Sequence, residues 1–145
     1  MKKKRIIIII IATAMIYTAA WMSNRGMIEE RYSDGMIPYD NVTYTYLDDE
    51  GYSYNLKLPD YPDFTGNLCV TAPGNEVSFF IWPSISGKFE YGIQISDVDD
   101  GRMEITRCVM TDSRGTPIEG DRQMLNGYKE TIDDIVERAD NMWEL

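Results

Sequence analysis

Four consecutive cations followed by a long uncharged stretch dominate the N-terminal part of this chain. The cations occupy positions 2–5, six isoleucines follow at 6–11, and no further charge occurs before Arg25. A positive segment followed by an apolar one is the layout of an export signal, whose positive end stays in the cytoplasm. We therefore expect the remainder of the chain to be extracytoplasmic, either secreted or anchored by this segment.

Residues 1–22 are predicted to be either a cleaved signal peptide or a single-pass membrane anchor. Small residues ending at Ala20 have the spacing that signal peptidase accepts, and cleavage there is slightly favoured. As an anchor, the uncharged residues 6–22 are at the short end for a spanning helix, with Tyr17 and Trp21 suited to the outer interfacial belt. No cysteine lies near this site, which excludes a bacterial lipoprotein anchor.

The exported part is strongly acidic. The whole chain has 14 basic and 24 acidic residues, but residues 1–20 hold four of the basic residues and no acidic one. Removing them changes the net charge from −10 to −14. This balance argues against a nucleic-acid partner, which needs a basic footprint, so an unidentified protein, peptide or envelope component is the expected partner. Membrane contact is expected only through residues 6–22, if they are not cleaved.

Residue types for common catalytic and metal chemistry are scarce. The sequence has no histidine, which is the commonest general base and a frequent metal ligand, and only two cysteines. It also lacks a glycine-rich phosphate loop and a serine nucleophile elbow. We therefore expect a non-catalytic protein without a cofactor. A small carboxylate-dependent hydrolase, with two acids from different strands meeting in a pocket, is one alternative.

Acidic turns suggest a second alternative, a Ca²⁺-dependent envelope protein. Residues 97–101 read Asp-Val-Asp-Asp-Gly, which resembles the start of a calcium loop, but the glycine comes one position too early. Residues 48–50 form another acidic turn before Gly51. Hairpin turns that expose acids to solvent explain both segments better, so no metal ligands are assigned.

Period-two alternation from residue 42 onwards predicts an antiparallel sheet. Strands are expected at 42–46, 52–58, 68–72, 77–82, 88–96 and 102–111, with a short edge strand at 116–119. Residues 77–82 are apolar on both faces, which predicts a central strand covered on both sides. Residues 23–41 are predicted to be a linker or irregular segment, in which Met27, Ile28 and Tyr32 share one face of a short helix.

The C-terminal segment has helical periodicity. Apolar residues from Tyr128 to Trp143 follow a 3.6-residue rhythm, and Asn126 is placed to cap the helix. The expected fold class is α+β: residues 42–145 form an antiparallel β-meander of about six strands with one C-terminal amphipathic helix packed on a face. The N-terminal hydrophobic export segment precedes this domain.

The two cysteines are the candidate disulfide. Cys69 and Cys108 both lie on predicted strands, and the expected compartment is oxidising. A bridge between them would close a loop of about 40 residues and contribute roughly 3 to 4 kcal/mol. The alternative is two buried free thiols that pack as small hydrophobic groups. A catalytic thiol is disfavoured because no histidine is present to activate it.

Aromatic side chains give the candidate binding surface. Tyr61, Phe64 and Trp82 are the residues we assign to it, because aromatic rings at loops and strand ends commonly form contacts. An exposed sheet face or an edge strand is a further option. Four tyrosines on the first hairpin favour a core face beneath the helix over a binding ladder. They are Tyr44, Tyr46, Tyr52 and Tyr54.

These observations predict a small exported or membrane-anchored extracytoplasmic protein, most simply a non-catalytic binding or interaction domain. The layout is typical of small exported α+β proteins of bacteria.

Overall fold

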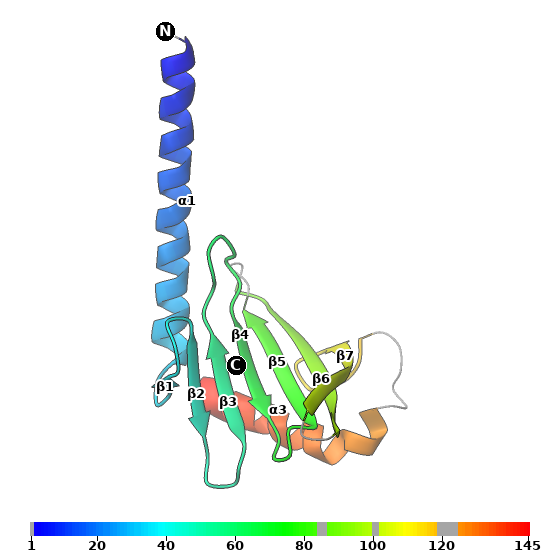
Figure 1. Ribbon diagram of the computed structural model, residues 1–145. Coiled ribbons are helices and arrows are strands. Elements are labelled where there is room, and N and C mark those ends of the chain that lie inside the picture. The colour runs from blue at the N-terminus through cyan, green and yellow to red at the C-terminus, as the bar shows by residue number, and fades with distance from the viewer. Residues whose placement is uncertain (1, 84–86, 100–101, 119–124) are drawn as a thin grey trace.

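The computed structural model describes residues 2–83, 87–99, 102–118 and 125–145 (Figure 1). A long N-terminal helix, α1 (Lys2–Tyr32), leads into seven strands, a 3₁₀ helix η1 (Asn126–Tyr128) and a C-terminal helix α3 (Lys129–Trp143). The strands are β1 (Ile37–Pro38), β2 (Thr43–Leu47), β3 (Ser53–Lys57), β4 (Asn67–Thr71), β5 (Val77–Pro83), β6 (Phe89–Asp99) and β7 (Arg102–Thr111).

All seven strands form one open antiparallel sheet in chain order, with β1 and β7 at its edges. The predicted α+β fold with a meander sheet is confirmed. The additional strand is β1, whose two residues pair with β2 and are too few to show an alternating pattern. The acidic turn between β2 and β3 is closed by the carboxylate of Asp48, which accepts the N–H groups of Glu50 at 3.0 Å and Tyr52 at 2.9 Å.

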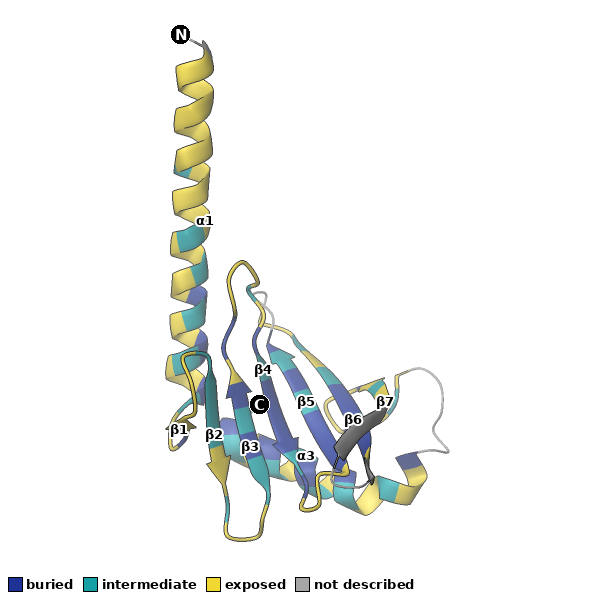
Figure 2. Cartoon of the chain, viewed as in Figure 1, coloured by how far each residue is buried: buried dark blue, intermediate teal, exposed yellow. Residues whose placement is uncertain are grey.

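The core lies between one face of the sheet and the two helices. Helix α3 contributes Ile132, Ile135, Ala139 and Trp143, which form one stripe along the helix and are buried against the sheet (Figure 2). Alternate residues of the central strands supply the opposing surface. They include Tyr54, Leu56, Leu68, Val70, Val77, Phe79, Ile81, Ile93 and Ile95.

The hairpin tyrosines belong to this core face, as the pattern predicted. Tyr54 is buried and contacts Trp143 edge-on, with ring centroids 6.1 Å apart. Tyr44 and Tyr52 pack against the same core, while Tyr46 lies beside Tyr54 at the margin of the sheet.

Arg138 of α3 ties the helix to the β2–β3 turn. Its guanidinium bonds Asp48 at 3.1 Å, pairs with Glu50, bonds Asp134 at 3.2 Å and stacks over the ring of Tyr52 at 3.7 Å. Burial by itself would raise the pKa of Asp48. The hydrogen bonds donated to its carboxylate, that of the Tyr52 N–H foremost, and the charge of Arg138 bring that pKa below its ordinary value. The turn is therefore fixed on the helix by a partly sheltered ionic cluster.

The structure corrects three expectations about local structure. Residues 23–32 continue α1 as a helix instead of forming an irregular linker, and the chain breaks only at the turn before Met36, where Gly35 takes a φ of 73°. Asn126 lies in η1 and does not cap α3, whose N-cap position is taken by Tyr128 without a side-chain hydrogen bond. Among the described residues, strand β5 has both helices on its core face, and Phe80 and Trp82 on its other face are half-exposed.

Candidate functional site

The loop between β3 and β4 lies along the side of α1 (Figure 1). Three α1 side chains donate hydrogen bonds to successive loop carbonyl oxygens: Tyr17 Oη to Pro62 at 2.6 Å, Trp21 Nε1 to Asp63 at 2.9 Å, and Asn24 Nδ2 to Phe64 at 2.7 Å. The donors are spaced three or four residues apart and therefore share one face of the helix. The loop backbone consequently follows the helix axis.

Aromatic rings fill the contact between helix and loop. We call Tyr17, Trp21, Tyr61 and Phe64 the aromatic cluster. The Tyr17 ring meets Tyr61 at 6.1 Å and Phe64 at 5.1 Å between centroids, and Trp21 meets Tyr61 at 5.5 Å. All three contacts are edge-to-face, an arrangement worth about 0.5–1.5 kcal/mol per pair beyond area burial. The cluster therefore holds the loop on the helix.

Arg25 extends the same contact further along α1. Its guanidinium donates to the carbonyl oxygen of Pro59 at 3.1 Å and to that of Asn41, and it lies 5.7 Å from the ring centroid of Trp21. The helix is thus fixed to the loop before β2 as well as to the loop after β3.

The last turns of α1 are part of the domain core. Ile28 and Tyr32 are buried, and Trp143 of α3 donates from Nε1 to the Tyr32 carbonyl oxygen at 3.2 Å. Burial raises the pKa of Tyr32. Tyr44 of β2 donates its hydroxyl to Glu29, and this hydrogen bond to a carboxylate raises the pKa of Tyr44. Helix α1 is therefore joined to the sheet by packing and by hydrogen bonds.

The opposite end of α1 stands clear of the domain. The isoleucines at 6–11 are 53–64% exposed, and Figure 2 shows this end of the helix free of other elements. Among the described residues, one helix is long and apolar enough to cross a membrane: an 18-residue window within Lys3–Tyr32 has a mean hydropathy of 2.1 and no buried residue. This finding fits a signal segment or a membrane anchor.

The structure divides the predicted binding surface into two parts. Tyr61 and Phe64, on the loop between β3 and β4, belong to the aromatic cluster and pack against α1. Trp82 lies on the open sheet face, where its ring stacks beside Phe80 at 5.8 Å between centroids and covers Gly92. A Cβ at Gly92 would lie 3.1 Å from the Trp82 ring, so the glycine leaves room for the indole. The open face therefore carries one pair of half-exposed aromatic rings.

The predicted disulfide between Cys69 and Cys108 is absent, and both thiols are free. Cys69 is on β4 and Cys108 on β7, with two strands between them. Three strand spacings amount to about 14 Å, whereas a disulfide needs Cα atoms within roughly 7 Å. Burial raises the pKa of the Cys69 thiol to about 11, while Cys108 is exposed. The predicted meander already implies this separation, because it places two strands between those of Cys69 and Cys108.

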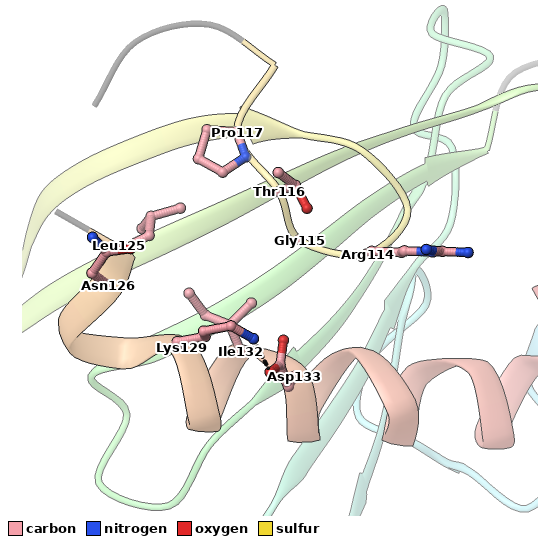
Figure 3. Close-up of a pocket in the computed structure, with 9 residues that line it drawn as sticks. All are labelled: Arg114, Gly115, Thr116, Pro117, Leu125, Asn126, Lys129, Ile132 and Asp133. Atoms are coloured by element: carbon pink, nitrogen blue, oxygen red, sulfur yellow. Dashed lines mark hydrogen bonds and ion pairs between the residues drawn. The ribbon is translucent and has the colours of Figure 1, made fainter. Parts of the chain in front are cut away.

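One cavity, of about 220 Å³, lies between the turn after β7 and the beginning of α3 (Figure 3). Gly115, with a φ of 73°, brings the turn so close to the helix that a Cβ there would lie 2.5 Å from Ile132. Lys129 and Asp133 at the cavity rim pair with each other at 2.5 Å. The cavity therefore has an apolar floor, and the two charges of Lys129 and Asp133 at its rim compensate each other.

A second cavity, of about 430 Å³, carries three carboxylates. They belong to Asp133, Glu137 and Asp140, all on α3, and not to two facing strands as the hydrolase alternative requires. Among the residues that the structure describes, no group of three or more acidic or cysteine side chains could hold a metal ion. Of the turn at 97–101, residues 100–101 lie outside the described residues.

These features define a class of protein: an antiparallel sheet domain whose N-terminal helix is long enough to span a membrane and is built into the domain core. Comparison with protein-family models, curated proteins and solved structures finds no match to this chain.

The sequence interpretation missed the part of the site contributed by Asn24, Arg25 and Glu29. The signal was present in the spacing of Trp21, Ile28 and their neighbours, which continues the helical rhythm beyond the apolar segment. The change from apolar to polar residues near position 23 lies inside the helix and does not mark its end.

Proposed function

We propose that this chain is a membrane-anchored extracytoplasmic protein in which α1 is retained as a single-pass anchor and the sheet domain is a non-catalytic binding module. The observation that carries the proposal is the continuity of α1, which passes from the free apolar segment into the domain core without a break. Cleavage after Ala20 would remove Tyr17 and its three contacts with the loop. A retained membrane anchor preserves these three contacts of Tyr17.

The distribution of charge supports an orientation with the domain outside. Positions 2–5 are all cationic and stand at the free end of α1, and cationic flanks are held on the cytoplasmic side. The net charge of −14 beyond residue 20 favours a soluble, externally exposed domain.

The open sheet face supports a binding role. It presents Phe80 and Trp82 half-exposed, with Glu90 paired opposite Trp82 and the exposed Met110 opposite Gly92, a mixed apolar and polar surface suited to a protein, peptide or envelope component. Two described cavities hold more than one acid. In one of them, all three acids come from α3. The other holds Glu90 and Asp112, but the Asp112 carboxylate already accepts the N–H groups of Arg114 and Thr116. Although burial by itself raises the pKa of Asp112, these hydrogen bonds bring it below its ordinary value, whereas a general acid needs a raised one, which favours binding over carboxylate catalysis.

Membrane topology tests the proposal with a probe that the chain already carries. Because Cys108 is exposed and Cys69 is buried, a membrane-impermeant maleimide should label intact cells at Cys108 alone, and Cys108→Ser should abolish the label. The labelled chain should stay in the membrane pellet after alkaline carbonate extraction. Release of the chain into the soluble fraction, or labelling only after cell lysis, would contradict the anchor or the orientation.

Photo-crosslinking tests the binding role separately. A photoreactive residue at Trp82 in the membrane-bound full chain should give a discrete adduct. The same residue at Glu137, which is exposed on α3 on the opposite face of the sheet, should not. Equal adducts from both positions, or none from Trp82, would refute a binding role for the open face.

A further inference from the structure

The free part of α1 is shorter than a membrane is thick. From Lys2 to Ile16 the helix rises roughly 22 Å at 1.5 Å per residue, whereas the hydrocarbon core of a bilayer is about 30 Å thick. Lysine and arginine side chains near a helix end can reach back to the headgroups, so the span is counted from Lys2, and about 30 Å of helix then ends near Met22. The loop between β3 and β4 contacts α1 at Trp21, beside this outer boundary, and at Tyr17, about one helical turn inside it. A membrane-spanning α1 therefore brings this loop to the lipid.

The loop backbone is suited to such a place. Non-helical backbone is tolerated in lipid only where its polar groups are already bonded, because each unpaired group costs several kcal/mol there. The carbonyl oxygens of residues 62–64 each accept a hydrogen bond from α1, and the N–H of Asp63 donates to the Asp60 carbonyl at 2.7 Å. Pro59 and Pro62 have no N–H to satisfy. The carbonyl oxygens of the loop therefore lose few hydrogen bonds to water when it meets lipid.

The side chains set the depth of the contact. Tyr61 is 55% exposed, and tyrosine and tryptophan rings collect at the boundary between hydrocarbon and headgroups. Asp60 and Asp63 are exposed carboxylates of the same loop, and charged groups are costly in the hydrocarbon core. The ring of Tyr61 and the carboxylates of Asp60 and Asp63 are therefore both best placed in the headgroup region.

We propose that residues 59–64 and the aromatic cluster sit in the headgroup region of the outer leaflet, so that the sheet domain rests on the membrane surface at a fixed orientation. The inference rests on the proposed function, in which α1 remains as the anchor. The loop then acts as a second membrane contact beside the spanning helix.

Depth-dependent fluorescence quenching tests this contact in the full chain, reconstituted in phosphatidylcholine vesicles. Tyr61→Cys in a Cys108→Ser background receives an environment-sensitive fluorophore, since Cys69 is buried and should not react. Leu47→Cys is the control, because Leu47 is 68% exposed and ends β2 beside the β2–β3 turn, at the opposite end of the sheet from the loop. Nitroxide lipids carry the quencher in the headgroup or near the bilayer centre.

The headgroup nitroxide should quench the label at Tyr61 at least about twofold more than the label at Leu47, and more than the central nitroxide does. A label at Asp60→Cys, which leaves the rings intact, should repeat the result. Equal quenching at the loop and control positions, with the chain retained in the vesicles, would overturn the loop contact alone. Loss of the chain from the vesicle fraction would overturn both the anchor and the contact.

Discussion

Replacing Tyr32 by alanine distinguishes a helix built into the core from a helix that merely precedes a linker. Tyr32 is 3% exposed and belongs to the core cluster, beneath Trp143. Its side chain buries roughly 150 Å² or more, which at about 25 cal/mol per Å² corresponds to ~4 kcal/mol. Large-to-small core substitutions of aromatic residues cost a similar ~3–5 kcal/mol. Tyr32→Ala should therefore strongly destabilise the domain.

Tyr39→Ala is the matched control, because Tyr39 is 78% exposed and exposed substitutions generally change stability by less than about 0.5 kcal/mol. Thermal unfolding of the full chain in detergent micelles, followed by tryptophan fluorescence, measures both variants. At roughly 3–5 °C per kcal/mol for a domain of this size, Tyr32→Ala should lower the Tm by about 10–20 °C. A Tm indistinguishable from that of Tyr39→Ala would refute the integration of α1 and restore the linker interpretation.

Three further predictions concern the sheet and α3. Arg138→Met removes the tie to the β2–β3 turn and should cost about 1–2 kcal/mol in denaturant unfolding, whereas Lys129→Met, at an exposed i,i+4 pair, should cost under about 0.5 kcal/mol. Folding lowers the pKa of Asp48, so the ionised carboxylate contributes to stability above its unfolded pKa, and this contribution is lost as pH falls through the folded pKa. The free energy of unfolding should therefore decrease as the pH is lowered below about 4, and it should decrease less steeply in Asp48→Asn. Gly115→Ala combines a φ of 73° with a clash against α3 and should lower the Tm more than Gly74→Ala, where φ is 88° but the space is open.

The sheet was predictable because local patterns determine it. Alternation on the first hairpin assigned its tyrosines, such as Tyr44 and Tyr54, to the core face, and the acidic turn at 48–50 with Gly51 marked the hairpin. In a meander, each strand pairs with its chain neighbour, so turn positions alone give the strand order. The C-terminal helix followed from its apolar stripe for the same local reason.

The contacts of α1 were not predictable in this way, because they join residues far apart in the chain. The bonds from Tyr17 and Asn24 to the β3–β4 loop span 45 and 40 residues. Nothing in the local pattern of Tyr61 or Phe64 distinguishes a ring that packs on a helix from one that faces a partner. The separation of Cys69 from Cys108, by contrast, follows from the predicted meander, which places their strands three positions apart.

The intact mass of the protein isolated from its native membrane tests the central claim most directly. The account predicts a mass that includes residues 2–20 ahead of Trp21. A mature chain that begins at Trp21 would contradict it, because the anchor and the Tyr17 contacts would then be absent from the working protein.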